Sequence, residues 1–199
     1  MLALQASDEA DKVTDVDPSW SLTDDALVLI LHAESDINEQ VPTDRSPIGM
    51  RPGQLGGTMT DELWLRETAV LRLISTVEAY TNAASELFIT KKSLPLPKSP
   101  FTWPQRVKHY LNEHAIDLEA RDGWDQVEAG IDLRNCLAHG LGNLTELLLS
   151  EETLGNRMKH IDVSVGGNRM HLTMATVPKL AEGCRSFVLD VEKELIARL

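Results

Sequence analysis

The amino-acid sequence predicts a mainly helical protein, a helical bundle with one small β-hairpin inserted before the C-terminal helix. Three observations support this fold class. Aromatic residues make up only 5% of the 199 residues, while Leu and Ala are abundant, which favours helices packed on helices. Apolar residues recur at helical spacing in several long stretches. Two β-favouring runs, 158–165 and 169–174, flank the turn sequence Gly166-Gly167-Asn168, which is typical of a hairpin.

The length and the hydrophobic content of 42% fit one domain, which we place at residues 21–199. Residues 1–20 are acidic and lack apolar periodicity, so we expect a poorly ordered tail there. Ser21 to Asp25 then supply a hydroxyl and two acids ahead of the apolar run 26–31, which predicts a capped first helix. Residues 36–59 hold three prolines and four glycines and therefore predict a long loop. Loops of this length are often mobile or functional.

The strongest helical pattern begins at Asp61 and Glu62 and is expected to run to about Thr90. Its apolar stripe is wide, which indicates a central helix with several neighbours. The stripe comprises Leu63, Val70, Ile74, Val77, Ala84 and Phe88, with Leu73, Tyr80 and Leu87 beside it. After prolines at 95, 97 and 100, Thr102 can cap a further helix that has Pro104 in its first turn. That helix is expected to turn Val107, Tyr110 and Leu111 inward.

A third helical pattern begins at Asp122 and is expected to end at Gly140 and Gly142. Residues 144–149 suggest one more short helix. The final helix is expected over residues 176–199, with one apolar face. This face comprises Leu180, Cys184, Phe187, Val188, Val191 and Leu195. Cys136 and Cys184 both fall in apolar helical patterns, so we predict buried, reduced thiols and no disulfide scaffold.

The formal net charge of −12 argues against a protein that coats nucleic acid nonspecifically, because such binding needs a basic surface. It leaves room for a small positive site on an acidic body. The longest apolar run, 26–31, is too short to span a bilayer, and no basic start precedes an apolar N-terminal segment. We therefore expect a cytoplasmic protein without a membrane partner.

Side chains that could act in catalysis are most concentrated near the end of a predicted helix, in the segment Arg134-Asn135-Cys136-Leu137-Ala138-His139-Gly140. The Arg134 guanidinium can hold a phosphate through two contacts. The His139 imidazole can move protons near neutral pH, and the Asn135 amide can fix a hydroxyl or a phosphate oxygen. On an ideal helix Asn135 and His139 share a face, whereas Arg134 and His139 lie about 140° apart. Those two can converge only if the helix ends between them or the arginine reaches around.

The motif resembles the Arg-polar-x3-His signature of the HEPN superfamily (higher eukaryotes and prokaryotes nucleotide-binding). The long helix containing 73–80 before the motif, and the small insert and helix after it, are similar to the bacterial branch called RiboL-PSP-HEPN. The resemblance covers roughly residues 60–199. It implies a homodimeric, metal-independent endoribonuclease without a cofactor, whose two motifs form one composite site. His139 would move the proton or position the 2′-hydroxyl, Arg134 would stabilise phosphate charge and Asn135 would orient one of them.

The resemblance further implies a toxin or defence effector, with an RNA substrate and an antitoxin or regulatory protein as possible partners. Two alternatives stay open. The domain can be a noncatalytic module that binds a nucleotide or a partner protein through the same cleft. The motif can also be a structural helix end, in which His139 caps carbonyls and Arg134 pairs with Asp132 or Glu128.

Several other residues are weaker candidates. Glu78 can pair with Arg134 or can be a plain surface residue. Trp103 and Trp124, with Arg106 and Lys108, can form an RNA-stacking edge or, for the tryptophans, core anchors. Tyr80 is expected in the core, and Asn82 is expected to face solvent.

We predict no metal site. Cys136 and His139 have no second pair at zinc-ligand spacing, and His109 and His114 are five residues apart. The glycines at 53–57 lack the lysine and hydroxyl of a P-loop.

Overall fold

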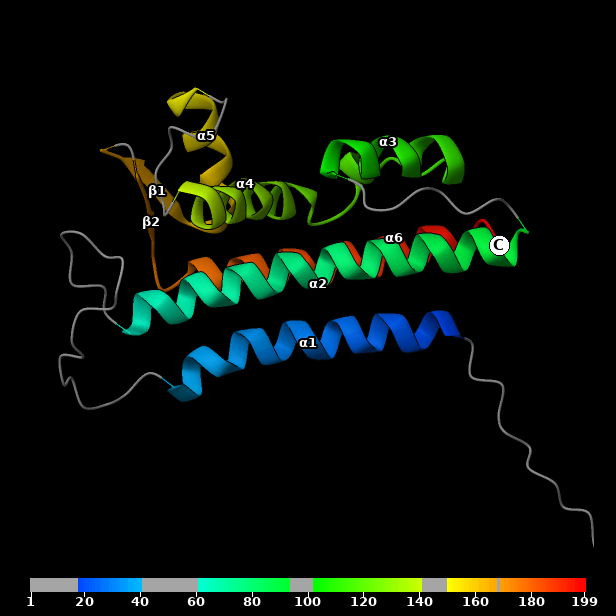
Figure 1. The fold of residues 1–199 in the computed structure, drawn as a ribbon, viewed down its shortest axis with the longest axis horizontal. Helices are drawn as coiled ribbons and strands as arrows, with labels where there is room; N and C mark the ends of the chain where they lie inside the picture. Colours follow the sequence, from blue (N-terminus) through cyan, green and yellow to red (C-terminus); the bar gives the residue numbers. More distant parts are fainter. Residues whose placement is uncertain (1–17, 41–60, 94–101, 141–149, 168) are drawn as a thin grey trace, which may run out of the picture.

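The computed structural model describes residues 18–40, 61–93, 102–140, 150–167 and 169–199. Its order of elements follows the chain (Figure 1). The elements are α1 (Pro18–Gln40), α2 (Asp61–Lys91), α3 (Trp103–His114), the 3-10 helix η1 (Leu118–Ala120), α4 (Trp124–Gly140), α5 (Glu151–Met158), the 3-10 helix η3 (Lys159–Ile161), β1 (Val163–Gly166), β2 (Arg169–Leu172) and α6 (Thr176–Ile196). The predicted fold class is confirmed: the protein is mainly helical, with a two-stranded hairpin before its last helix.

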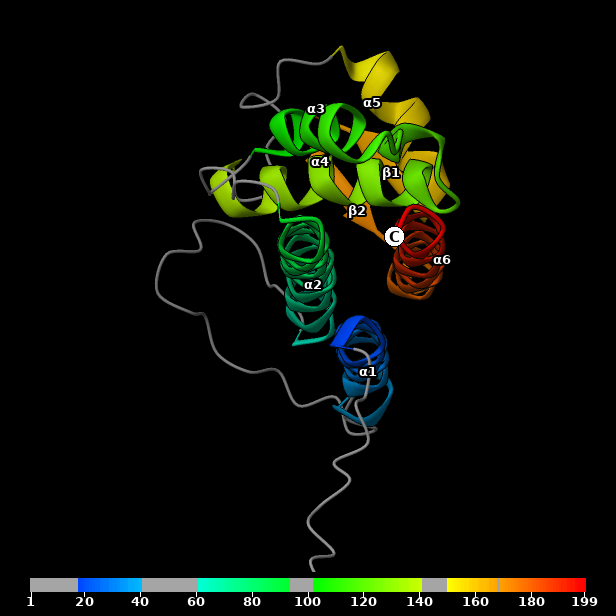
Figure 2. The same cartoon turned by 90° about the vertical axis from the view of Figure 1, so that its right-hand side faces the viewer.

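Three long helices, α1, α2 and α6, lie side by side, and each contacts the other two (Figures 1 and 2). The helix α1 runs opposite to α2 and α6. Their apolar faces form the main core, and all six apolar residues predicted for one face of the last helix are buried. The predicted stripe of α2 is also confirmed at its centre, where Val70, Ile74 and Val77 are fully buried.

The helix α4 crosses over α2 and α6 at close range (Figure 2). Gly130 lies at this crossing, where a Cβ atom would lie 2.6 Å from both Ile74 Cδ1 and Leu180 Cδ1 and would force those side chains to shift. The shorter α3 and α5, together with the hairpin, lie on the same side of the long helices as α4. This crossing brings the residues of α4 against the middle of α2.

The start of α3 forms as predicted. Thr102 precedes the helix in an extended conformation, and its backbone N–H donates to the Gln105 side-chain oxygen at 3.0 Å. Tyr110 is fully buried, and its hydroxyl donates to the Thr81 carbonyl of α2 at 2.6 Å. The expectation for Leu111 is wrong, since this side chain is 52% exposed. Only one face of so short a helix meets α2.

The hairpin pairs Val163 with Leu172 and Gly166 with Arg169. Gly167 has a φ of 59°, which a tight turn requires and a glycine adopts readily. The predicted strand 158–165 is wrong over its first half, because α5 ends at Met158 and η3 follows it. Leu154, Met158 and Ile161 are buried at intervals of four and three residues, which is a helical period. Ser150 caps α5 by accepting from the Thr153 N–H at 3.1 Å.

The first helix begins at Pro18, inside the segment 1–20 that was assigned to the tail, and it extends to Gln40. Residues 36–40 of the predicted loop are therefore helical. An ion pair between Asp36 and Arg72 of α2 holds this end of α1 against its neighbour. The rest of the predicted tail (1–17), most of the loop (41–59) and the short helix expected at 144–149 lie outside the described residues.

Both cysteines, Cys136 and Cys184, are buried and neither is part of a disulfide, as predicted. Within the described ranges, none of the helices has the length and apolar character needed to cross a bilayer.

Candidate functional site

The crossing of α4 over α2 joins Arg134 to Glu78. Arg134 Nη2 donates to Glu78 Oε1 at 2.6 Å, and the two side chains are 24% and 26% exposed. Of the acids considered from the sequence, Glu78 is therefore the partner of Arg134. Asp132 and Glu128, the alternative partners, pair with Arg157 of α5 instead.

A second guanidinium lies beside this ion pair. Arg106 of α3 is only 3% exposed, and its Nη1 lies 3.9 Å from Glu78 Oε1. Its Nε and Nη2 donate to Asn82 Oδ1 at 3.3 and 3.0 Å, and its guanidinium stacks over the Trp103 ring. Burial lowers the pKa of Arg106, and the charge of Arg134 lowers it further, while Glu78 raises it. The Glu78 carboxylate thus interacts with two cations, Arg106 and Arg134.

The expectation that Asn82 faces solvent is wrong. Its amide oxygen accepts two hydrogen bonds from Arg106 and is part-buried. Asn82 lies four residues after Glu78 on α2, so both side chains lie on one face of the helix. That spacing, Glu-x3-Asn opposite an arginine-bearing helix, is the signal from which the contact could have been anticipated.

Asn135 lies next to Arg134 in sequence and borders the same cleft. His139 is in the last turn of α4, four residues after Asn135, and its side chain lies outside the described part of the structure. Because α4 continues to Gly140, it does not end between Arg134 and His139. The backbone therefore places these two positions about 140° apart around the helix axis.

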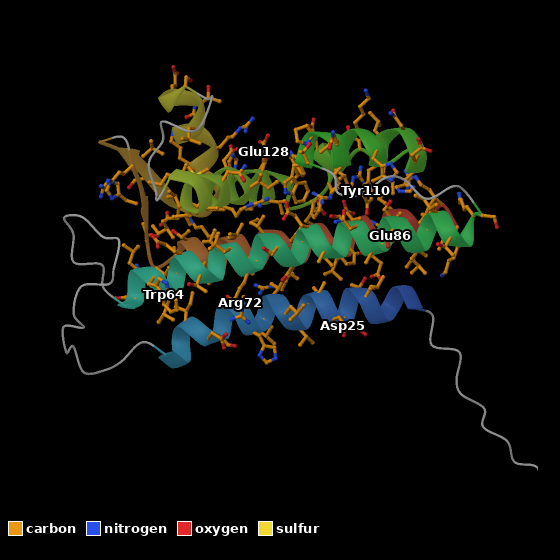
Figure 3. All side chains as sticks on the ribbon, viewed as in Figure 1. Asp25, Trp64, Arg72, Glu86, Tyr110 and Glu128 are labelled. Carbon is orange, nitrogen blue, oxygen red and sulfur yellow. The ribbon has the colours of Figure 1, made fainter. Side chains whose placement is uncertain are left out.

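The cleft has a volume of about 770 Å³ and lies between α3, α4 and α5, with Glu78 reaching it from α2. Its wall includes the apolar side chains Val107, Leu111 and Ile131. At the end away from Glu78, Arg157 Nη2 lies 3.0 Å from Glu128 Oε1, and Arg157 Nη1 donates to Asp132 Oδ2 at 2.9 Å. Glu128, labelled in Figure 3, lies on the side of α4 that faces α5.

The two acids of this second cluster have raised pKa values. Burial raises the pKa of Asp132, and Arg157 opposes that shift. Burial also raises the pKa of Glu128, and the negative charges of Asp132, Glu119 and Asp125 add to it against Arg157. Negative charge therefore exceeds positive charge at this end of the cleft.

Trp103 and Trp124 are core anchors. Their rings meet edge to face with centroids 6.1 Å apart, and they are only 7% and 8% exposed. Both border the cleft from beneath, but neither offers an open face for stacking. Lys108 is exposed at the cleft rim.

A second polar cluster joins α2 to α3. Ser85 Oγ lies 2.9 Å from His109 Nε2 and 2.9 Å from His114 Nε2. Serine has one hydroxyl proton, so it donates to at most one of the two rings and at least one ring donates to it. Burial, which is the largest cause, and the neighbouring His109 together lower the pKa of His114 to about 4. The sequence interpretation had used these histidines only to judge zinc spacing and missed their meeting at Ser85.

Across the described residues, no group of three or more His, Cys, Asp or Glu side chains is arranged to hold a metal ion. Comparisons of the chain with protein-family models, with curated proteins and with solved structures find no match.

Proposed function

We propose that this protein is a metal-independent endoribonuclease of HEPN type that acts as a homodimer, with Arg134, Asn135 and His139 as its site. The main support for the proposal is the hydrogen bonding of the Arg134 guanidinium at the edge of the cleft. One terminal nitrogen is fixed by Glu78, and Nη1 has no hydrogen bond to any residue that the structure describes. A guanidinium oriented by a carboxylate in this way is prepared to receive a phosphate oxygen.

The reaction is cleavage of RNA by its own 2′-hydroxyl. The 2′-oxygen attacks the adjacent phosphorus as a base removes its proton, and the 5′-oxygen leaves as it receives a proton. The products are a 2′,3′-cyclic phosphate and a 5′-hydroxyl. In this reaction His139 moves a proton, Arg134 stabilises the charge on the phosphorane and Asn135 orients the reacting groups.

The helical geometry of α4 supports a site shared between two copies. Arg134 and His139 of one chain lie about 140° apart on an uninterrupted helix, which disfavours their meeting on one phosphate. A two-fold axis beside the end of α4 would bring His139 of one copy toward Arg134 of the other. A role as a toxin or defence effector in the cytoplasm, restrained by a regulatory protein, extends this proposal.

The test is incubation of the purified protein with total RNA in the presence of EDTA. We expect fragments with cyclic phosphate ends, and their loss in Arg134→Ala and His139→Ala. The matched controls are Arg169→Ala and His32→Ala, which change exposed residues away from the cleft and should cleave like the wild type. Light scattering should give the mass of a dimer. Unchanged cleavage by His139→Ala, or a catalytically active monomer, would remove the proposal.

A noncatalytic module that binds a nucleotide or a partner protein is the second candidate. The balance of charge in the cleft favours it, since four carboxylates and three cationic side chains border the space. These are Glu78, Glu119, Glu128, Asp132, Lys108, Arg134 and Arg157. A cleft with more carboxylates than cations gives a long polyanion less favourable binding free energy than it gives a single nucleotide. Binding without any RNA fragments would favour this candidate.

A further inference from the structure

The cleft carries opposite net charge at its two ends. At one end, two guanidiniums of Arg106 and Arg134 share the single carboxylate of Glu78. At the other end, Glu128 and Asp132 share the single guanidinium of Arg157. Among these six side chains, the first group has an excess of one positive charge and the second an excess of one negative charge. Arg106 is buried and does not itself border the cleft, which Lys108 and Glu119 also line. A ligand that fits both ends has an anionic group and, at a distance from it, a group rich in hydrogen-bond donors.

The spacing between the ends follows from α4. Glu128 and Arg134 are six residues apart on this helix, which separates them by about 9 Å along its axis and by about 120° around it. Between them the wall is apolar and includes Ile131 from α4 with Val107 and Leu111 from α3. A flat, weakly polar ring can lie against such a wall while its polar edge and its charged substituent reach the two ends. A nucleotide has this form.

We propose that the cleft binds one guanine nucleotide, with its phosphate at Arg134 and the Watson–Crick edge of its base at Glu128. This inference rests on the proposed function only in taking Arg134 as the phosphate ligand. It adds to that function a preference for RNA in which guanosine flanks the cleaved phosphate.

Guanine is favoured by the chemistry of the acceptor. A carboxylate offers two oxygens side by side and no donor. Guanine is the standard base that presents two adjacent N–H donors, N1–H and N2–H, on one edge, whereas adenine and cytosine each present one amino group beside an acceptor nitrogen. Adenine and cytosine would therefore place a lone pair against the Glu128 carboxylate.

The contact with Arg157 leaves Glu128 able to accept. Arg157 Nη2 lies 3.0 Å from Oε1, and Oε2 has no hydrogen bond to a described residue. The Glu128 side chain is 30% exposed, so a ligand in the cleft can reach it. Arg157 also holds Asp132, which keeps the guanidinium in place when a base approaches. Burial is the main cause of the raised pKa of Glu128, and the negative charges of Asp132, Glu119 and Asp125 add to it.

The test is calorimetric titration of the full-length protein with guanosine 3′-monophosphate and guanosine 5′-monophosphate, and with the two adenosine monophosphates. We expect at least one guanosine isomer to bind tenfold or more tightly than its adenosine counterpart. Glu128→Gln replaces one acceptor oxygen with a donor and should abolish that ratio. Glu152→Gln removes the same charge from an exposed position on α5 and should keep it. Thermal unfolding of both variants shows whether Arg157 still holds α5.

Cleavage mapping separates this inference from the proposed function. RNA cut beside guanosine by the wild type, with the preference lost in Glu128→Gln, supports both. If the RNA is cut without regard to base and guanosine and adenosine monophosphates bind with equal affinity, the guanine site is overturned. The nuclease proposal is then unaffected. If the protein binds guanosine monophosphates selectively but does not cleave RNA, the nuclease proposal is overturned and the guanine-binding proposal is supported.

Discussion

Glu78 and Arg134 lie 56 residues apart in sequence and form an ion pair of 2.6 Å where α4 crosses α2. The same carboxylate oxygen lies 3.9 Å from Arg106 of α3. Glu78 is thus the one acid contacted by a cation from each of two other helices at this point of the fold. Its charge holds two guanidiniums close together that would otherwise repel each other.

Glu78→Gln should destabilise the fold. Removing the charge leaves Arg106 and Arg134 adjacent without their shared counterion, and Arg106 is too buried for water to screen it. Since Glu78 itself is a quarter exposed, we expect a loss of about 1–2 kcal/mol in the free energy of unfolding. Urea denaturation measures this loss. Glu86→Gln, an exposed change on the same helix (Figure 3), should cost less than about 0.5 kcal/mol. Equal midpoints for the two variants would contradict the shared role of Glu78.

The cluster of Ser85, His109 and His114 should make stability fall in mild acid. The pKa of His114 is lowered in the folded protein to about 4, whereas an unfolded histidine has a pKa near 6.5. The unfolded chain therefore binds the proton first, so the stabilisation is complete above pH 6.5 and is lost as the pH falls toward 4. The loss should reach on the order of 3 kcal/mol at pH 4. Burial also lowers the pKa of His109, which acts in the same direction.

Unfolding by urea at several pH values between 7 and 4 measures this dependence. His114→Gln keeps a side chain that can bond to Ser85 but does not titrate, so its free energy of unfolding should depend less on pH over the same interval. His160→Gln removes an exposed histidine of η3 and should leave the slope as in the wild type. An equal slope for His114→Gln and the wild type would exclude His114 as the source.

Local patterns in the sequence were sufficient where one helix face meets the core. The six apolar positions of α6 follow a 3.6-residue period and are all buried. Thr102 precedes a helix because threonine is a preferred N-cap residue and Pro104 fits the first helical turn. The first half of 158–165 was misread because Met158, Ile161 and Val163 are β-favouring or apolar at spacings that suit either structure. Packing against α4 and α6 decides between helix and strand for these residues. A single sequence does not show which side chains are buried by that packing.

The site was predicted in its parts more than in its connections. The sequence singled out Arg134 and Asn135 and offered Glu78 as one possible partner. It did not predict that Asn82 holds Arg106, or that Glu128 and Asp132 pair with Arg157, because these contacts join residues 24 to 29 positions apart on different helices. Such pairs depend on the angle at which helices cross. At this crossing Gly130 packs against Ile74, where a Cβ atom would come within 2.6 Å of Cδ1.

Gly123→Ala should be strongly destabilising. Gly123 precedes α4 with a φ of 80°, and a Cβ atom there would lie 2.2 Å from the Gly183 carbonyl oxygen of α6. Backbone atoms cannot yield as the tip of a side chain can, so we expect a loss of about 2–4 kcal/mol in the free energy of unfolding. Gly155→Ala is the matched control. It meets no atom within 4 Å inside α5 and should stabilise the protein by up to about 1 kcal/mol. Similar melting temperatures for the two variants would contradict the close approach at Gly123.

Thr23→Val should show that α1 and α6 are joined by a buried hydrogen bond. Thr23 Oγ1 donates to Glu192 Oε1 at 2.6 Å, and both residues are buried. Valine has nearly the same shape but no hydroxyl, so the carboxylate loses its donor without a cavity being formed. We expect a loss of about 2 kcal/mol in the free energy of unfolding, which chemical denaturation would measure. Thr90→Val, an exposed change on α2, should cost far less. In a Thr23→Val, Glu192→Leu double-mutant cycle the two losses should not add, because each change removes the same hydrogen bond. Strict additivity would mean that this hydrogen bond does not stabilise the contact between α1 and α6.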